Sequence, residues 1–231
     1  MQAKCAFLIT LFTALTAGSS MMTSVLAQTD VPYYEVDEIV VKDQKGYEAS
    51  GVAKIREAAE AMGCHIFAGG YNKAQALVGD PPANRLVIVR CPNKETGDKR
   101  WKLVMDWFDE GKKYATFRSI AADGNATALE PGAYYQVVEI NVKDQPGYEA
   151  SGVKEVRATQ EAVGGKVIAG GYNKATSREG APVANRYLII QYPNKAANEK
   201  HFNDSVRPWW ESEGKKYSDF RAIGVEGIAP K

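Results

Sequence analysis

Residues 41–52 read Val-Lys-Asp-Gln-Lys-Gly-Tyr-Glu-Ala-Ser-Gly-Val, and residues 142–153 repeat this stretch with a single change. Further repeated blocks are Ala-Gly-Gly-Tyr-Asn-Lys-Ala at 68 and 169, Pro-x-Ala-Asn-Arg at 81 and 182, and Gly-Lys-Lys-Tyr at 111 and 214. The offset is 101 residues for the earlier blocks and 103 for the last. A repeat of this length indicates a duplicated domain, with two extra residues late in the second copy.

The duplication divides the chain into parts. We expect a first repeat at residues 31–124, a linker at 125–131 and a second repeat at 132–228. The linker assignment rests on its small and turn-forming residues, which are typical of a connection between domains.

Each copy predicts the same series of secondary-structure elements. In the first copy we expect strands at 33–41, 66–71, 86–89 and 116–121, and helices at 43–62 and 93–111. Val52, Ile55 and Ala59 recur at helical spacing in the first helix, and the Gly69-Gly70 pair in the second strand suggests a bulge or a close backbone approach. The order β-α-β-β-α-β is the ferredoxin-like, or split βαβ, motif.

Such a unit places both helices on one face of a four-stranded sheet and leaves the other face apolar. A domain of this size needs a partner for that face. We therefore predict an α+β protein in which two ferredoxin-like repeats pack sheet to sheet as an α/β barrel within one chain. The expected molecule is a monomer with internal pseudo-two-fold symmetry.

The N-terminus has a different character. Lys4 precedes an apolar run from Cys5 to Ala17, and the small residue Ala27 follows a polar stretch. This order predicts a secretory signal peptide at residues 1–27, and hence export to the periplasm or the extracellular space. The alternative is an uncleaved membrane anchor, although the apolar run is short for a bilayer.

The overall charge excludes some classes of partner. The chain has 231 residues with a formal net charge of +1, so neither nucleic acid nor a membrane surface is an expected partner. The sequence has only two histidines, at positions 65 and 201, and it lacks the usual catalytic motifs. We expect no metal and no cofactor.

Two cysteines remain after signal-peptide cleavage. Cys64 precedes the second predicted strand and Cys91 ends the third, and antiparallel pairing of these strands would bring the two together. Their counterparts Gly165 and Tyr192 lack thiols, so both cysteines are absent from the second copy. In an oxidising compartment a structural disulfide fits this pattern. Two free buried thiols and a redox-active pair are the alternatives.

The repeated polar residues are the candidate ligand-binding groups. Hydroxyl, amide and guanidinium groups that converge near a cleft could hold a carboxylate or an enolate-like oxygen. The candidates of this kind are Tyr71, Asn72 and Arg85 with their counterparts Tyr172, Asn173 and Arg186. The alternative is that the Asn residues set turn geometry and that each Arg pairs with a nearby acid.

Arg118 and Arg221 lie on the last predicted strand of each copy. From there their side chains could reach the barrel interior and favour an anionic ligand. The alternative is an ion pair at the barrel rim or toward a helix.

Each copy resembles the family called domain of unknown function 1330. The resemblance rests on Asp-x-x-x-Tyr at each first helix, on Gly164-Gly165, on Arg-x-x-x-x-x-x-Pro at each third strand, and on the closing Tyr-x-x-x-Arg-x-Ile. It implies the dimeric α/β-barrel superfamily, which includes cofactor-independent monooxygenases, small isomerases and haem-using enzymes.

The leading functional hypothesis is an exported protein that binds a small ligand, either anionic or aromatic. The resemblance implies an alternative, a cofactor-independent oxygenase or isomerase. A second alternative is a structural module whose surface contacts other proteins. A cavity lined by the candidate residues would favour the ligand or the enzyme, whereas a filled interior would count against both.

Overall fold

The computed structural model describes residues 31–125 and 127–228. The predicted signal peptide, residues 1–27, lies outside the described residues. In the first repeat the strands are β1 (Tyr33–Val41), β2 (His65–Tyr71), β3 (Ala74–Val78), β4 (Arg85–Cys91) and β5 (Ala115–Asp123). Its helical segments are α1 (Gln44–Tyr47), the π-helical η1 (Glu48–Val52), α2 (Ala53–Ala61) and α3 (Lys94–Gly111).

The second repeat has the same order. Its strands are β6 (Tyr134–Val142), β7 (Lys166–Tyr172), β8 (Ala175–Glu179), β9 (Arg186–Tyr192) and β10 (Ser218–Glu226). Its helical segments are α4 (Gln145–Ala150), α5 (Val153–Ala162), α6 (Lys195–His201), η2 (Phe202–Val206), α7 (Arg207–Trp209), η3 (Trp210–Gly214) and α8 (Lys215–Tyr217). The predicted α+β class is confirmed.

The two repeats exchange a strand. The sheets have the orders β2-β4-β1-β5-β8 and β3-β10-β6-β9-β7, and all their pairings are antiparallel. Strand β8 of the second repeat therefore completes the sheet of the first, and β3 of the first completes the sheet of the second. The predicted four-stranded sheets are wrong in this respect, because part of the expected loop after Tyr71 forms the exchanged strand.

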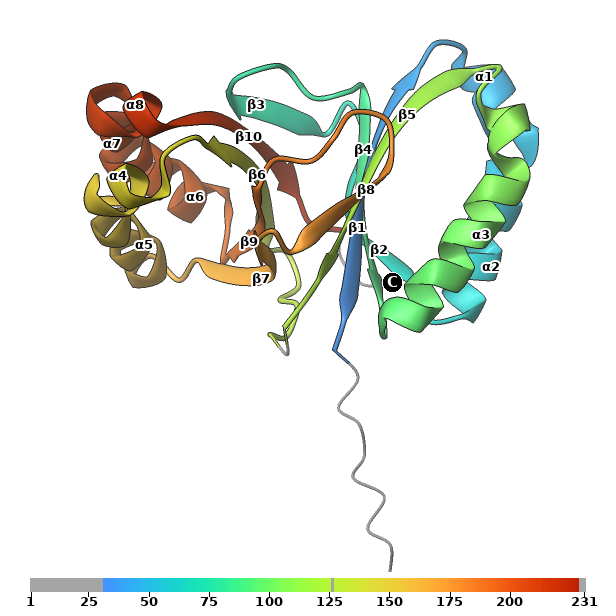
Figure 1. Cartoon of the computed structure of the whole chain (residues 1–231). Coiled ribbons are helices and arrows are strands. Elements are labelled where there is room, and N and C mark those ends of the chain that lie inside the picture. The colour runs from blue at the N-terminus through green and yellow to red at the C-terminus, as the bar shows by residue number, and fades with distance from the viewer. Residues whose placement is uncertain (1–30, 126, 229–231) are drawn as a thin grey trace, which may run out of the picture.

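The sheets pack face to face and the helices cover their outer sides. In Figure 1, α2 and α3 lie on one flank and α4 to α8 on the other, with the strands between them. The central core combines buried side chains from both repeats, among them Tyr34, Ile88, Tyr135 and Ile189. The interior between the sheets is thus filled with apolar and aromatic side chains, which counts against a ligand or catalytic site between the sheets.

The predicted helix starts and the close backbone approach at Gly69 are confirmed, whereas the bulge of β2 lies before the glycine pair. Asn93 caps α3 by accepting a hydrogen bond from Thr96 N at 2.9 Å, since an unpaired N–H at a helix start needs such an acceptor. The β2–β4 register shifts between Ile66 and Ala68. At Gly69, with φ +96, an added Cβ would lie 2.1 Å from the backbone oxygen of Leu86, so a close backbone approach also requires glycine there.

The two extra residues of the second repeat lie in its second helix. Helix α3 is regular, whereas the equivalent helix contains the π-helical segments η2 and η3. A π-bulge accommodates one extra residue within a helix, so two such segments account for the change of offset. Trp107 and Trp209 remain equivalent, since their Nε1 atoms donate to Ser50 O and to Ser151 O, both at 3.0 Å.

Candidate functional site

A cavity of about 70 Å³ lies between the helices and the sheet of the first repeat. We call it the first cavity. Most of its wall is apolar or aromatic: Ile39, Tyr47, Val52, Ile55, Ala59, Ile66, Val87, Val89, Trp101, Val104, Trp107, Phe108 and Phe117. Asp37, Arg100 and Ser119 contribute polar groups to it. The exposed Glu60 also lines it, so the cavity reaches the surface.

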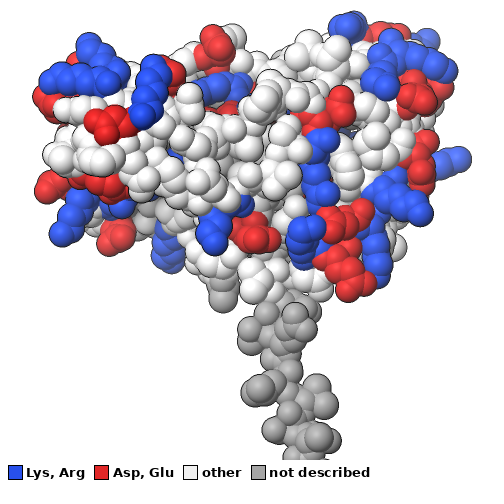
Figure 2. Space-filling model, viewed as in Figure 1, with Lys and Arg blue, Asp and Glu red and all other residues white. Residues whose placement is uncertain are grey.

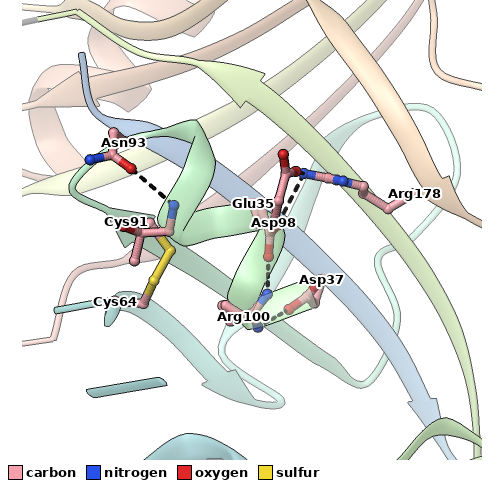
Figure 3. Close-up of a disulfide and its surroundings, with 9 residues drawn as sticks. Glu35, Asp37, Cys64, Cys91, Asn93, Asp98, Arg100 and Arg178 are labelled. Atoms are coloured by element: carbon pink, nitrogen blue, oxygen red, sulfur yellow. Dashed lines mark hydrogen bonds and ion pairs between the residues drawn. A yellow bond between two sulfur atoms is a disulfide. The ribbon is translucent and has the colours of Figure 1, made fainter. Parts of the chain in front are cut away.

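Arg100 organises the polar wall of the first cavity. Its guanidinium donates from Nη1 to Glu35 Oε2 and from Nη2 to Asp37 Oδ2 at 2.8 Å. Ser119 Oγ donates to the other Asp37 oxygen, Oδ1, at 2.5 Å. Glu35 and Asp37 lie two residues apart on β1, and strand periodicity turns both toward α3. Figure 3 shows Arg100 between the two carboxylates.

The second repeat completes this cluster through its exchanged strand. Arg178 lies on β8, and its Nη2 donates to Tyr33 Oη at 2.9 Å and to Asp98 on α3. The same nitrogen lies 3.8 Å from Glu35 Oε1. That oxygen is buried and has no hydrogen-bond partner among the described residues. A cation from the second repeat therefore lies near the buried carboxyl of the first.

The charge balance around Arg100 favours a proton on Glu35. One guanidinium serves two carboxylates, and Glu35 is fully buried. Burial is the largest influence and, with Asp37 nearby, raises the pKa of the Glu35 carboxyl to about 7 against the lowering effect of Arg100. Desolvation of a charge can outweigh the attraction of a partner. The charge of this cluster therefore changes near neutral pH.

The second repeat lacks this cluster. By the repeat offsets, the counterparts of Glu35, Asp37, Arg100, Ser119 and Arg178 are Gln136, Val138, His201, Ala222 and Leu77. Every charged member is replaced by a neutral or apolar residue, or by histidine. Comparison of the two repeats thus distinguishes the residues that the fold requires from those that occur only in the first repeat.

Cys64 and Cys91 form a disulfide beside this site. It joins the start of β2 to the end of β4, and Cys64 lines the first cavity. The pairing is the one expected from the antiparallel strands. In the second repeat the Tyr192 side chain takes the place of Cys91.

Arg118 and Arg221 meet at the pseudo-two-fold axis, where both pair with acids. Arg118 contacts Glu38 at 3.0 Å and Glu139 at 2.5 Å. Arg221 contacts the same carboxylates at 2.6 and 2.9 Å. An open cleft of about 490 Å³ lies beside this ring and is lined in part by Arg118, Glu139 and Arg221. An anion bound there would compete with two carboxylates, so the predicted ligand role stays a prediction.

The two asparagine candidates follow the ends of strands β2 and β7. Asn72 and Asn173 adopt φ of +52 and so set a left-handed turn, which asparagine tolerates well. Asn84, next to Arg85, hydrogen-bonds Val41 N and O at 2.8 Å each. These contacts agree with the turn alternative for the asparagines, while any ligand role remains a prediction.

Three arginines among the candidates, Arg85, Arg118 and Arg186, line the cavities under the helices. Arg85 lines the first cavity, and its Nη1 donates to Glu48 Oε1 at 2.9 Å. Arg186 lines the equivalent cavity of the second repeat. Tyr71 and Tyr172 lie half-buried at the strand ends beside them. Tyr71 and Asn72 do not line the open cleft with Arg118 and Arg221.

Four polar residues of this cluster were not expected from the sequence: Glu35, Asp37, Arg100 and Ser119. The sequence contains a signal for them, since the strand residues Glu35 and Asp37 are replaced in the second copy. The candidates expected from the sequence are residues that both copies share, whereas the polar wall of the first cavity consists of residues that differ between the copies.

The chain matches no protein-family model and no curated protein sequence. Solved structures are similar to it in fold. A proposed monooxygenase from Fusobacterium nucleatum subsp. nucleatum has a TM-score of 0.51 at 13% identity, with 86% of this chain and 93% of that chain covered. A chlorite dismutase variant from Candidatus Nitrospira defluvii has a TM-score of 0.53 at 11% identity, with 86% and 92% covered. A haem-binding protein from Thermus thermophilus has a TM-score of 0.45 at 10% identity, with 86% and 92% covered.

The two likenesses with the higher TM-scores are likenesses of fold. At these identities they show the fold alone. Among the described residues, no helix has the length and apolarity needed to cross a membrane. The same residues contain no group of three or more His, Cys, Asp and Glu side chains placed to hold a metal ion. On the face in Figure 2, acidic and basic side chains lie interspersed.

Proposed function

We propose that this protein binds a small molecule in the first cavity, and that the molecule has an apolar body and a hydrogen-bond donor such as a hydroxyl or an amine. The observation that carries this proposal is the wall itself, in which a mainly aromatic and aliphatic lining holds Asp37, Arg100 and Ser119 together at one place. Apolar pockets with a few convergent polar groups are typical ligand sites.

At the Asp37 end of the wall, the carboxylate favours a donor over an anion. Asp37 and Glu35 share the single guanidinium of Arg100, so the cluster has an excess of acceptor oxygens. A ligand hydroxyl or ammonium group would donate to Asp37, whereas a carboxylate would be repelled by it. A donor is therefore expected beside Asp37, while Arg56, Arg85 and Arg118 supply cations elsewhere in the wall.

The size of the cavity limits the ligand. Each water molecule needs about 10 to 15 Å³ of such cavity volume, so a cavity of about 70 Å³ holds roughly five groups of that size. A longer ligand would extend past Glu60 and the half-buried Arg56 into solvent. A compact amine or alcohol therefore fits best.

Three probes of matched size test the proposal: n-propylamine, n-propanol and propionate. Each is titrated into the ¹⁵N-labelled protein, and the amide shifts of β1 and α3 are followed by NMR. The amine and the alcohol should shift these signals in a saturable way. In Asp37→Asn the amine affinity should fall about tenfold or more, because a hydrogen bond to a charged group is lost.

The control variant is Asp106→Asn, an exposed residue of the same helix α3. It should bind both probes as the parent does. If neither n-propylamine nor n-propanol gave saturable shifts, the proposed site would be refuted. Equal binding of n-propylamine by Asp37→Asn and Asp106→Asn would also refute it.

Export, a monomeric state and membership of the family called domain of unknown function 1330 belong to the same proposal. Export is supported by the sequence pattern at residues 1–27 and by the disulfide, since disulfides persist in oxidising compartments. The family is supported by the motifs of both copies.

The second candidate function is a cofactor-independent oxygenase or isomerase. It is favoured by Glu35, whose buried carboxyl has its pKa raised to about 7, because perturbed acids cluster at catalytic sites. Asp37, which lines the cavity, would then accept the substrate proton, and Glu35 would act through Arg100. Exchange of the α-hydrogens of acetone in D₂O tests this: parent protein should accelerate it and Asp37→Asn should not.

The superfamily resemblance also implies haem-using enzymes, but haem does not fit the two cavities under the helices. Both ring nitrogens of His201 are occupied, Nδ1 with Tyr192 Oη at 2.8 Å and Nε2 with Val156 O at 3.1 Å. His65 is exposed and lies on no cavity wall described above. The cavities under the helices, about 70 and 50 Å³, are also far smaller than a typical pocket for a large ligand.

A further inference from the structure

The second repeat has its own cavity between helices and sheet, of about 50 Å³. We call it the second cavity. Its apolar wall includes Val138, Ile140, Val153, Leu188, Trp209 and Phe220. Gln136, Gln160 and His201 supply neutral polar groups, and Arg157 and Arg186 supply charge. No carboxylate of the kind found in the first cavity lines it.

His201 is held in its neutral form. Its Nε2 lies 3.1 Å from Val156 O, and because a carbonyl only accepts, this nitrogen carries the hydrogen. Nδ1 lies 2.8 Å from Tyr192 Oη, whose hydroxyl donates to Gln136 Oε1 at 3.1 Å. Burial lowers the pKa of the imidazole. The charges of the second cavity thus come from the two arginines.

These two arginines share a single carboxylate. Arg157 Nη2 donates to both oxygens of Glu149 at 3.0 and 3.1 Å. Arg186 Nη1 lies 3.6 Å from the same carboxylate, too far for a good hydrogen bond. The Nε atoms of both arginines are buried without a partner among the described residues.

The guanidinium of Arg186 is already fixed in place. It lies 5.6 Å from the ring centroid of Tyr148 and 5.9 Å from that of Tyr172, and its side chain is 13% exposed. In the first repeat the equivalent Arg85 has its own carboxylate, Glu48, at 2.9 Å. A preorganised, desolvated cation with unused donors is suited to a planar anion.

We propose that the second cavity binds a short-chain carboxylate, with the carboxylate group on Arg186 and Arg157 and the alkyl chain directed into the apolar wall. Arginine matches a carboxylate in shape and in hydrogen-bonding geometry. The first cavity differs in having Asp37 in its wall and in pairing Arg85 closely with Glu48, so this carboxylate site is assigned to the second cavity alone. This site is separate from the first cavity and does not depend on a ligand there.

Propionate is the probe, and amide shifts of α5 and β9 are the readout. Propionate should shift these signals in a saturable way, whereas n-propylamine should not. In Arg186→Gln the affinity for propionate should fall about tenfold or more. The matched control is Arg85→Gln, the equivalent change in the first repeat, which should leave the affinity unchanged.

Glu149→Gln gives a readout that a purely structural role of Arg186 would not produce. Removing the carboxylate that competes for both arginines should tighten propionate binding, while Glu48→Gln should not. Circular dichroism confirms that each variant is folded, and Arg157→Gln replaces Arg186→Gln if the latter is not. No saturable shift with parent protein, or weaker binding by Glu149→Gln, would overturn the inference. Because the probes and the signals differ, failure here is distinguishable from failure at the first cavity.

Discussion

Glu35→Gln should change how the stability of this protein depends on pH. The ordinary pKa of the carboxyl, 4.5, is raised to about 7 in the folded state. The folded state therefore binds this proton more tightly than the unfolded state does. The resulting stabilisation is fully present below pH 4.5 and is lost as pH rises toward 7. A difference of this size corresponds to roughly 3 kcal/mol in the free energy of unfolding.

Glutamine is the residue that the second repeat has at this position, Gln136, so the variant has a precedent in the same fold. It keeps the shape of the side chain and removes the titration. Urea unfolding followed by tryptophan fluorescence, at intervals from pH 4.5 to 8.5, gives the free energies. The variant should be more stable relative to the parent at pH 8 than at pH 5, by about 3 kcal/mol.

Other groups also titrate in this range, so the difference between variant and parent is the measured quantity. His201, whose pKa burial lowers, makes the protein more stable as pH rises toward 6.5, which is the opposite direction. The exposed Glu57→Gln on α2 is the control and should follow the parent at every pH. If Glu35→Gln also followed the parent, the carboxyl would be ionised throughout and the reasoning on burial would be wrong.

Two further predictions concern the first repeat. Reduction of the Cys64–Cys91 bond, which spans 27 residues, should lower the free energy of unfolding by about 3 to 4 kcal/mol. Mass spectrometry of the unreduced protein should find neither cysteine alkylated. Alkylation of both cysteines would contradict the bond. Gly69→Ala should destabilise by about 3 kcal/mol, because its Cβ would lie 2.1 Å from Leu86 O. Gly51→Ala, at a similar φ with no atom within 4 Å, should cost only about 1 kcal/mol; equal melting temperatures would contradict the contact argument.

The repeat made much of the architecture predictable. Strands such as β1, the cap at Asn93 and the close approach at Gly69 follow from local composition and are the same in both copies. The exchanged strand did not follow, because Ala74–Val78 has a weak strand signal between glycines and pairs with a strand of the other repeat. Local sequence contains no information on that partner.

The polar wall of the first cavity was missed for a related reason. Arg178 reaches Asp98 and Tyr33 only through the register of β8 on β5, which the sequence does not reveal. The ring formed by Arg118 and Arg221 also depends on the two sheets meeting. The nearness of these two arginines to Glu38 and Glu139 could not be inferred from either repeat alone.

The exchanged strands constrain the order in which the chain folds during synthesis. When residues 31–124 have emerged, β5 still has an open edge, because its neighbour β8 lies in the part not yet made. Strand β3 has likewise no partner until β10 is present. Unpaired edges invite pairing with other chains, so the N-terminal half is vulnerable to aggregation until synthesis is complete. A chain cut between its repeats would therefore yield two fragments that must recombine to fold.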